Sequence, residues 1–175
     1  DDLVVGAGAN VNTINFLAGD NTLNLAGVIA GTSMTLDAAG SATNDTLAIN
    51  VTDTGADAIN GIAIVTTDFE TVTIDTSGLG AAVDQTLGAV TMSASLGGTT
   101  TLNVKGDNAI DTSGVITAGT IDFSGVTDTD GVTMGAAAAS VTTITGSAGN
   151  DTLVGDASST ISGGAGNDTM TGGAG

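Results

Sequence analysis

The sequence has no cysteine, histidine, proline, tryptophan or tyrosine, and its only aromatic residues are Phe16, Phe69 and Phe123. Without cysteine the chain can form no disulfide, thiolate metal site or thiol nucleophile. Without histidine it can form neither an HExxH zinc site nor a Ser-His-Asp triad. Three aromatic rings cannot fill a thick core, and we expect them to fill or cap a thin one.

Basic residues are almost absent: Lys105 is the only one, against 19 acidic residues, and the net charge is −18. Self-repulsion of this size opposes compaction unless cations intervene. The lack of Lys and Arg excludes nucleic acid and anionic lipid surfaces as partners. The longest apolar stretch, at 135–139, is too short to cross a bilayer, so we expect no membrane insertion. Because the chain begins at Asp1 without a signal-peptide pattern, targeting signals are expected outside it.

The chain is rich in small apolar residues and glycine, with 41% hydrophobic residues and 28 Gly. A disordered acidic tail would be less apolar. Short runs alternate apolar and polar residues, the period of a half-buried strand, and no segment has a helical stripe. These runs are 23–25, 34–36, 47–51, 62–64, 72–74, 90–92, 102–104, 121–123, 132–134 and 141–144.

The spacing of the runs, about ten to fifteen residues, suits either the coils of a parallel β-helix or the strands of an antiparallel sandwich. Hairpin signals such as Asn60-Gly61 are scarce, and a sandwich would need larger core residues. The sequence therefore favours an all-β parallel β-helix, or β-solenoid. We predict an irregular β-solenoid over 1–145 and a regular β-roll over 146–175, truncated at its C-terminal end.

The regular end begins at Gly146 and reads GSAGNDTLV, GDASSTIS, GGAGNDTMT and GGAG. The first and third segments match the nonapeptide G-G-x-G-x-D-x-U-x, whereas the second is one residue short and lacks the central Gly and Asp. The glycines allow tight turns with carbonyl oxygens aimed inward, and the sixth-position Asp supplies a hard oxygen ligand for calcium. The eighth-position residues Leu153, Ile161 and Met170 are expected to stack into a thin core.

This pattern predicts a set of oxygen ligands for Ca²⁺. The predicted carboxylate ligands are Asp151 and Asp168. The predicted carbonyl ligands are Gly146, Ala148, Asn150, Gly163, Ala165, Asn167, Gly172 and Ala174. Asp156 is either an additional carboxylate or a solvated turn residue. The alternative interpretation of the whole segment is a turn-rich, Asx-capped linker, and the two close repeats in so acidic a chain favour calcium.

A similar segment occurs upstream, where residues 40–48 read GSATNDTLA. Thr43 replaces the fourth-position Gly, and a single turn cannot complete a shared site, so a strand-initiating turn is favoured over a ligand role for Asp45. Asp20 and Asp107 lie in weaker echoes. Glu70 and Lys105 are expected to be exposed coil residues.

On these nonapeptides the chain resembles the repeats-in-toxin (RTX) family. With the phrases DFETVTIDTSG and SVTTITGSAGNDTL it also looks like the calcium-dependent surface-layer (S-layer) proteins of Gram-negative bacteria such as Caulobacter. The resemblance implies export by a type I secretion system, through a C-terminal signal outside this chain. It also implies folding on extracellular Ca²⁺ and a place on the bacterial cell surface.

Three functions follow from the residues and this resemblance. The first is a structural segment that assembles into a lattice with neighbouring copies, with cell-surface polysaccharide as a partner of regions outside the chain. The second is a calcium-binding module of a type I-secreted adhesin or exoenzyme, and with a single base the chain itself is not expected to be an enzyme. The third is ice binding, suggested by Thr71-Val72-Thr73 and Thr99-Thr100-Thr101, although their irregular spacing argues against it.

Overall fold

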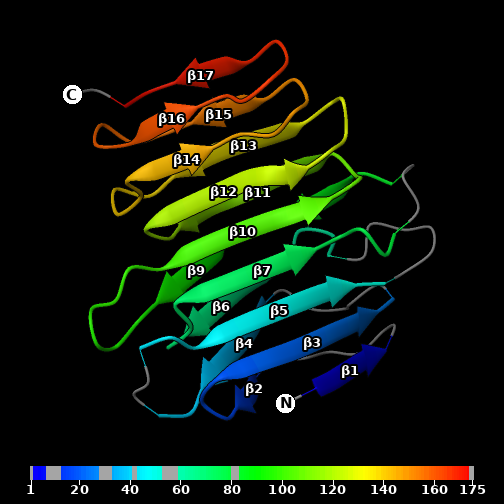
Figure 1. Ribbon diagram of the computed structural model, residues 1–175, viewed down its shortest axis with the longest axis vertical. Helices are drawn as coiled ribbons and strands as arrows, with labels where there is room; N and C mark the ends of the chain where they lie inside the picture. Colours follow the sequence, from blue (N-terminus) through cyan, green and yellow to red (C-terminus); the bar gives the residue numbers. More distant parts are fainter. Residues whose placement is uncertain are drawn as a thin grey trace.

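The chain folds into two large parallel β-sheets that face each other (Figure 1). The computed structural model describes residues 2–6, 13–27, 33–40, 43–52, 59–79 and 83–173. The first sheet contains β1 (Asp2–Gly6), β3 (Asp20–Ala26), β5 (Thr46–Val51), β7 (Thr71–Asp75), β10 (Thr101–Gly106), β12 (Thr120–Val126), β14 (Thr143–Thr145) and β16 (Thr160–Ser162). The second contains β2 (Thr13–Phe16), β4 (Ser33–Ala38), β6 (Ala63–Thr67), β9 (Val90–Ser93), β11 (Ile110–Thr117), β13 (Val132–Ala137), β15 (Thr152–Val154) and β17 (Thr169–Thr171), with β8 (Gln85–Leu87) paired to β11.

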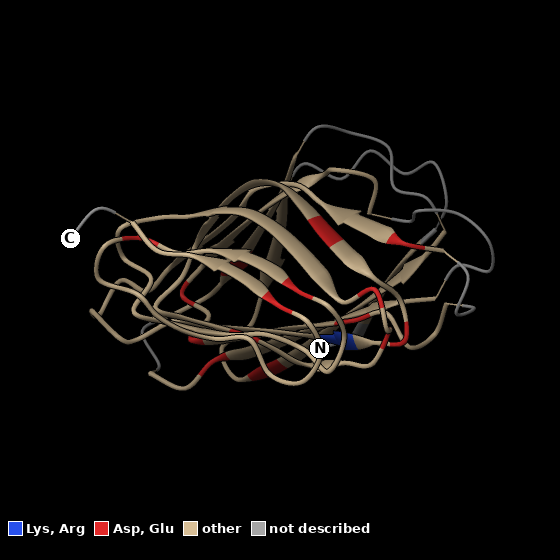
Figure 2. Ribbon diagram, turned by 90° about the horizontal axis from the view of Figure 1, so that it is seen from above, with Lys and Arg blue, Asp and Glu red and all other residues tan. Residues whose placement is uncertain are grey.

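The connectivity is that of a solenoid. Strands adjacent in each sheet come from successive passes of the chain, and all pairings among the described strands are parallel. Figure 2, viewed along the long axis, shows the two sheets as opposite walls of one flattened coil. The expected all-β class and the preference for a parallel solenoid over an antiparallel sandwich are confirmed. No helix among the described residues could cross a membrane.

The core is a thin apolar layer between the sheets. In β5 the side chains of Leu47, Ile49 and Val51 are buried, while the residues between them are half-buried on the outer face. This alternation follows from the period of two in a strand. The rings of Phe16 and Phe69 pack edge to face with centroids 5.9 Å apart, which confirms their predicted place in the core.

The coils differ in length but remain in register. Thr71 pairs with Thr101, so that coil takes 30 residues, whereas the last coils, from Thr143 to Thr160 and from Thr152 to Thr169, each take 17. Both sheets continue past residue 145, because β14 pairs with β12 and β16 in the first sheet and β15 pairs with β13 and β17 in the second. The division between 1–145 and 146–175 stays a prediction, based on the regularity of the repeats.

The outer face of the first sheet carries a continuous row of threonines. The register places Thr46, Thr71, Thr101, Thr120, Thr143 and Thr160 next to one another in successive strands. Loops of different lengths absorb the irregular spacing of these residues in the sequence. These threonines are therefore aligned in the sheet, and the expectation that irregular spacing in the sequence would prevent an aligned array is wrong.

Candidate metal centre

Three turns at one edge of the solenoid lie above one another, at residues 127–131, 146–151 and 163–168. Each leads from a strand of the first sheet into a strand of the second. The pairings of Thr133 with Thr152 and of Thr152 with Thr169 stack the turns in successive coils. We call this stack the carboxylate edge, because it contains the predicted ligands Asp151 and Asp168.

Asp151 is a buried carboxylate held by backbone and side-chain donors. Its side chain is 1% exposed. Its Oδ1 accepts the N–H of Val132 at 2.8 Å and the hydroxyl of Ser147 at 2.7 Å, while its Oδ2 accepts the N–H of Ser147 at 2.6 Å. Two carboxylate oxygens offer about four acceptor sites, so one site on Oδ2 is left for a further ligand.

Asp168 repeats this arrangement one coil later. Its Oδ1 accepts the backbone N–H of Asp151 at 3.1 Å, as Asp151 accepts that of Val132 in the coil before. The backbone also links these coils, because Thr169 donates its N–H to the carbonyl of Asp151 at 2.7 Å. The two carboxylates therefore form a ladder along the solenoid axis, each tied to the preceding coil.

The glycines of the repeat lie where oxygen atoms come close to the backbone. A Cβ on Gly146 would lie 2.1 Å from the carbonyl oxygen of Gly163, and a Cβ on Gly163 would lie 2.2 Å from Asp168 Oδ2. Gly164 and Gly166 face the carbonyl oxygens of Ser147 and Gly149 in the same way. The absence of side chains at these positions thus leaves an edge lined by oxygen atoms.

The predicted asparagine ligands form a second ladder at this edge. The N–H of Asn150 donates to the carbonyl of Thr129 at 3.0 Å, and Asn150 Oδ1 accepts the N–H of Asn167 at 2.9 Å. Ala148 and Ala165 are exposed, and Ala165 donates its N–H to the carbonyl of Ser147 at 3.3 Å. The structure therefore brings together the predicted ligand positions between 146–151 and 163–168.

Asp156 and Gly172 do not join this group. Both follow strands of the second sheet and lie at the opposite edge of the coil. Asp156 Oδ1 accepts the N–H of Ser158 at 3.0 Å, which is the local bond of an Asx turn, in agreement with the turn interpretation of this residue. The predicted ligand Ala174 lies outside the described residues.

Oxygen donors at the carboxylate edge suit calcium. Ca²⁺ takes about 6–8 oxygen ligands, and among the described residues no three acidic side chains are grouped around a common point. Backbone carbonyls and water would have to supply the ligands beyond Asp151 and Asp168. Carbonyls that face a neighbouring coil include those of Asp128, Ser147 and Gly149, which the sequence did not single out.

A second pair of acids has the same geometry at the opposite edge. Asp45 is buried, and its Oδ1 accepts the N–H of Gly19 one coil earlier. Glu70 Oε2 accepts the N–H of Asp45 at 2.8 Å. Glu70 is half-buried, so its expected role as an exposed coil residue is wrong. Little in the sequence signals this pair, because Glu70 lies outside any glycine-rich repeat.

The single base is already paired. Lys105 is exposed, as expected, but lies in β10 rather than in coil, and its Nζ is 2.8 Å from Asp75 Oδ2. Burial raises the pKa of Asp75, but hydrogen bonds from Lys105 and Ser77 outweigh it and hold the pKa below its usual range. Figure 2 shows the base on one sheet and the acids spread around the coil.

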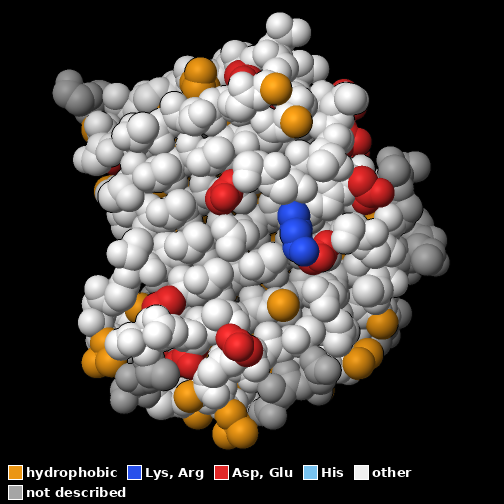
Figure 3. Space-filling view, in the orientation of Figure 1, with side chains coloured by type: hydrophobic (Ala, Val, Ile, Leu, Met, Phe, Trp, Pro, Cys, Tyr) orange, Lys and Arg blue, Asp and Glu red, His pale blue; other side chains and the backbone are white. Residues whose placement is uncertain are grey.

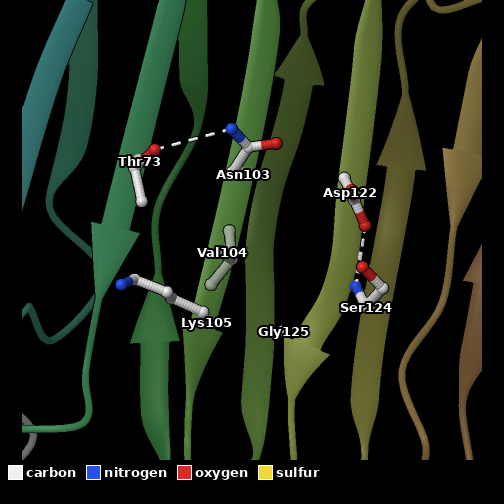
Figure 4. A pocket seen from close by; sticks show the side chains of 7 residues that line it. All are labelled: Thr73, Asn103, Val104, Lys105, Asp122, Ser124 and Gly125. Atoms are coloured by element: carbon white, nitrogen blue, oxygen red, sulfur yellow. Dashed lines mark hydrogen bonds between the residues drawn. The ribbon is translucent and has the colours of Figure 1, made fainter.

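A shallow polar hollow lies beside Lys105 on the outer face of the first sheet (Figure 4). The pairing of β10 with β12 shifts register here, and Gly125 approaches Lys105 so closely that an added Cβ would lie 2.5 Å from Lys105 Cβ. Asn103 Nδ2 lies 3.5 Å from Thr73 Oγ1, and Asp122 Oδ1 accepts the N–H of Ser124 at 2.8 Å. Asp122 is the one acid lining the hollow, so the paired carboxylates of a general acid and base are not found there.

The fold and its edges define the chain as an acidic parallel β-solenoid with carboxylates stacked in successive coils. No protein-family model, curated protein or solved structure matches it. Its function is therefore inferred from the chemistry of its own residues.

Proposed function

We propose that this chain is a structural segment of a secreted bacterial surface-layer protein, which folds and assembles into a lattice on binding extracellular calcium. Residues 146–175 would form an RTX-type β-roll that continues the irregular solenoid of 1–145. The observation that carries the proposal is the ladder of Asp151 and Asp168 on an oxygen-lined edge. Lattice contacts with copies of the same chain, and anchoring to polysaccharide through other regions, belong to this proposal.

The charge of the chain explains why calcium would control folding. With 19 acids and one base, the compact state brings together carboxylates that repel one another. Calcium bound between coils would offset this repulsion only in the folded state, so its binding free energy would become folding free energy. Extracellular modules bind calcium at about 10⁻⁴–10⁻³ M, so such a chain would stay unfolded before export and fold outside the cell.

The length of the last coils supports the β-roll. A coil of 17 residues corresponds to one nine-residue segment, GSAGNDTLV, followed by one eight-residue segment, GDASSTIS. Leu153 is buried and Ile161 packs against the core, whereas Met170 in the last described strand is exposed. Each turn of the solenoid would then contain two repeats, with the carboxylates of Asp151 and Asp168 one full coil apart.

The proposal is tested by circular dichroism and light scattering of the chain with and without millimolar calcium. We expect calcium to increase the β-sheet signal and to produce large ordered assemblies, visible as a two-dimensional lattice by electron microscopy. Magnesium at equal concentration serves as the control for ionic strength. β-structure that forms with calcium but stays monomeric would instead favour an adhesin or exoenzyme module, and the absence of any calcium response would contradict the proposal.

The threonine row favours ice binding as a second candidate function. Six threonines lie in adjacent strands, and strands in a sheet are about 4.8 Å apart, so these residues follow one another at about that interval. Figure 3 shows that uncharged side chains and backbone cover most of this face, with the lysine in contact with an acid and other acids scattered over the surface. A regular, uncharged array of this kind could order water on one face.

Ice binding is tested by observing single ice crystals in solutions of the chain. If the row binds ice, the chain will shape the crystals, and Thr120→Lys in the middle of the row will abolish the shaping. Thr133→Lys is the matched control, because Thr133 lies on the outer face of the second sheet. Crystals that grow as in buffer, or an equal loss in both variants, would reject this second function.

A further inference from the structure

The strongest unexplained feature outside the carboxylate edge is the buried carboxylate of Asp45. The residue is 1% exposed, and within the described part of the chain no donor lies within hydrogen-bonding distance of its Oδ2. Its other oxygen, Oδ1, accepts the N–H of Gly19. A buried charged oxygen without a partner is strongly unfavourable, and in native structures such an atom commonly marks an unseen ion or water.

A second carboxylate stands beside Asp45 in the next coil. Thr46 pairs with Thr71 in strands about 4.8 Å apart, which places the residues just before them, Asp45 and Glu70, side by side in adjacent coils. Glu70 Oε2 accepts the N–H of Asp45 at 2.8 Å, and Glu70 donates its own N–H to the carbonyl of Asp45 at 3.0 Å. Two carboxylates held this close repel each other unless a proton or a cation is shared between them.

No basic side chain is available to this pair. Lys105 is the only base of the chain, and Lys105 is bound to Asp75 on the outer face of the first sheet. The compensating charge at Asp45 and Glu70 must therefore come from solution. Carboxylate oxygens are hard ligands, and a divalent cation such as calcium prefers them.

The geometry repeats that of the carboxylate edge. Asp151 accepts the N–H of Val132 and is followed by Asp168, just as Asp45 accepts the N–H of Gly19 and is followed by Glu70. The difference lies in the number of donors. Both oxygens of Asp151 accept hydrogen bonds, three in all, whereas among the described residues Asp45 accepts a bond on Oδ1 and none on Oδ2. The need for a cation is thus greater at Asp45 than at Asp151.

We propose that Asp45 and Glu70 bind a calcium ion between two coils, at the edge opposite Asp151 and Asp168. Asp45 Oδ2 is the central ligand, Glu70 supplies the second carboxylate, and water completes the coordination. This inference deepens the proposed function, since it adds a calcium site within the irregular solenoid. A site here would join two coils far from the nonapeptide repeats, so that calcium stiffens both regions.

The site is tested by counting bound calcium ions with native mass spectrometry and measuring their affinities by isothermal titration calorimetry. Spectroscopic detection through protein sensitisation is impractical, because the chain lacks Trp and Tyr. We expect Asp45→Asn to remove one bound ion and Glu70→Gln to weaken one site by about tenfold or more. Asp84→Asn is the charge-matched control, since Asp84 is exposed and precedes β8 at the other edge.

Chemical unfolding gives an independent readout. In EDTA, Asp45→Asn should be at least as stable as the unchanged chain, because the amide keeps the bond to Gly19 and removes an uncompensated charge. In millimolar calcium the same variant should be the less stable of the two. An unchanged ion count in both variants, or an equal loss of stability with and without calcium, would overturn the site.

The test separates this site from the proposed function. Ions are counted on dilute, unassembled protein, so a chain that binds calcium through Asp45 but never forms a lattice would keep the site and reject the lattice. If the unchanged chain assembles with calcium but the Asp45→Asn variant still binds the full number of ions, the lattice is kept and the Asp45 site is rejected.

Discussion

Asp151→Asn is expected to lower the free energy of unfolding by about 1–3 kcal/mol in calcium-free buffer. Whichever way the amide turns, its NH₂ group faces a buried N–H, either that of Ser147 or that of Val132. One donor is then left without an acceptor, at the desolvation cost of a buried polar group. Urea unfolding followed by circular dichroism measures the loss.

Calcium should increase the difference in unfolding free energy between Asp151→Asn and the unchanged chain. A ligand that binds only the folded chain adds about 2.7 kcal/mol of stability at a concentration 100 times its dissociation constant. If Asp151 is a ligand, the asparagine variant loses most of this gain along with its carboxylate. Its deficit against the unchanged chain should therefore be larger in saturating calcium than in EDTA.

Asp130→Asn is the control for this prediction. Asp130 is exposed in the turn 127–131 of the same edge, so the variant removes the same charge with little change in packing. We expect its unfolding free energy to stay within about 0.5 kcal/mol of the unchanged chain. Equal behaviour of the two variants would mean that Asp151 contributes only net charge, and would remove it from the ligand set.

Much of the fold could be predicted from alternation alone. Runs such as 72–74 and 102–104 lie within β7 and β10, because one buried face imposes a period of two on the sequence. The strand β11 was not among the runs predicted from the sequence. Its pairing shifts register between Thr112 and Val115, where Ser113 and Gly114 interrupt the alternation. A bulge of this kind hides a strand from periodicity.

The candidate site was predictable where it depends on local sequence, and less so where it depends on contacts between coils. The nonapeptides located Asp151 and Asp168 because the repeat itself fixes the turn. Nothing local to Glu70 indicates that its carboxylate caps the N–H of Asp45, which lies 25 residues earlier. The threonine row was hidden for the same reason, since loop lengths set the register.

The reason for glycine in the repeat could not be read from the sequence alone. Thr43 occupies the position equivalent to Gly149, where the repeat calls for a glycine that allows a tight turn. The structure gives a different reason for glycine at 149: a Cβ there would lie 2.3 Å from the carbonyl oxygen of Asp128. Glycine is thus required at 149 because the neighbouring coil lies so close. Thr43, by contrast, is exposed. Glycine in these repeats thus reports close stacking of the coils.

Because the coils stack so closely, Gly164→Ala is expected to lower the free energy of unfolding by about 2–6 kcal/mol. Backbone strain would contribute about 1–3 kcal/mol of this loss and overpacking about 1–3 kcal/mol. The φ of Gly164 is +104°, a conformation that L side chains rarely adopt, and a Cβ would lie 2.0 Å from the carbonyl oxygen of Ser147. Relief of this clash would move the coil carrying Asp168 away from the coil carrying Asp151. Calcium affinity should therefore fall together with stability, as calorimetry would measure.

Two other glycines separate the causes of this loss. Gly97 has a positive φ of +71°, but a Cβ added there would meet nothing within 4 Å, so Gly97→Ala should show the backbone strain alone. Gly172 has neither constraint, and Gly172→Ala should be neutral or stabilising by up to about 1 kcal/mol. The loss of unfolding free energy should be largest for Gly164→Ala, smaller for Gly97→Ala and smallest for Gly172→Ala. Calcium affinity should fall only in Gly164→Ala. If all three variants unfolded alike, close stacking of the coils could not be what the repeat glycines provide.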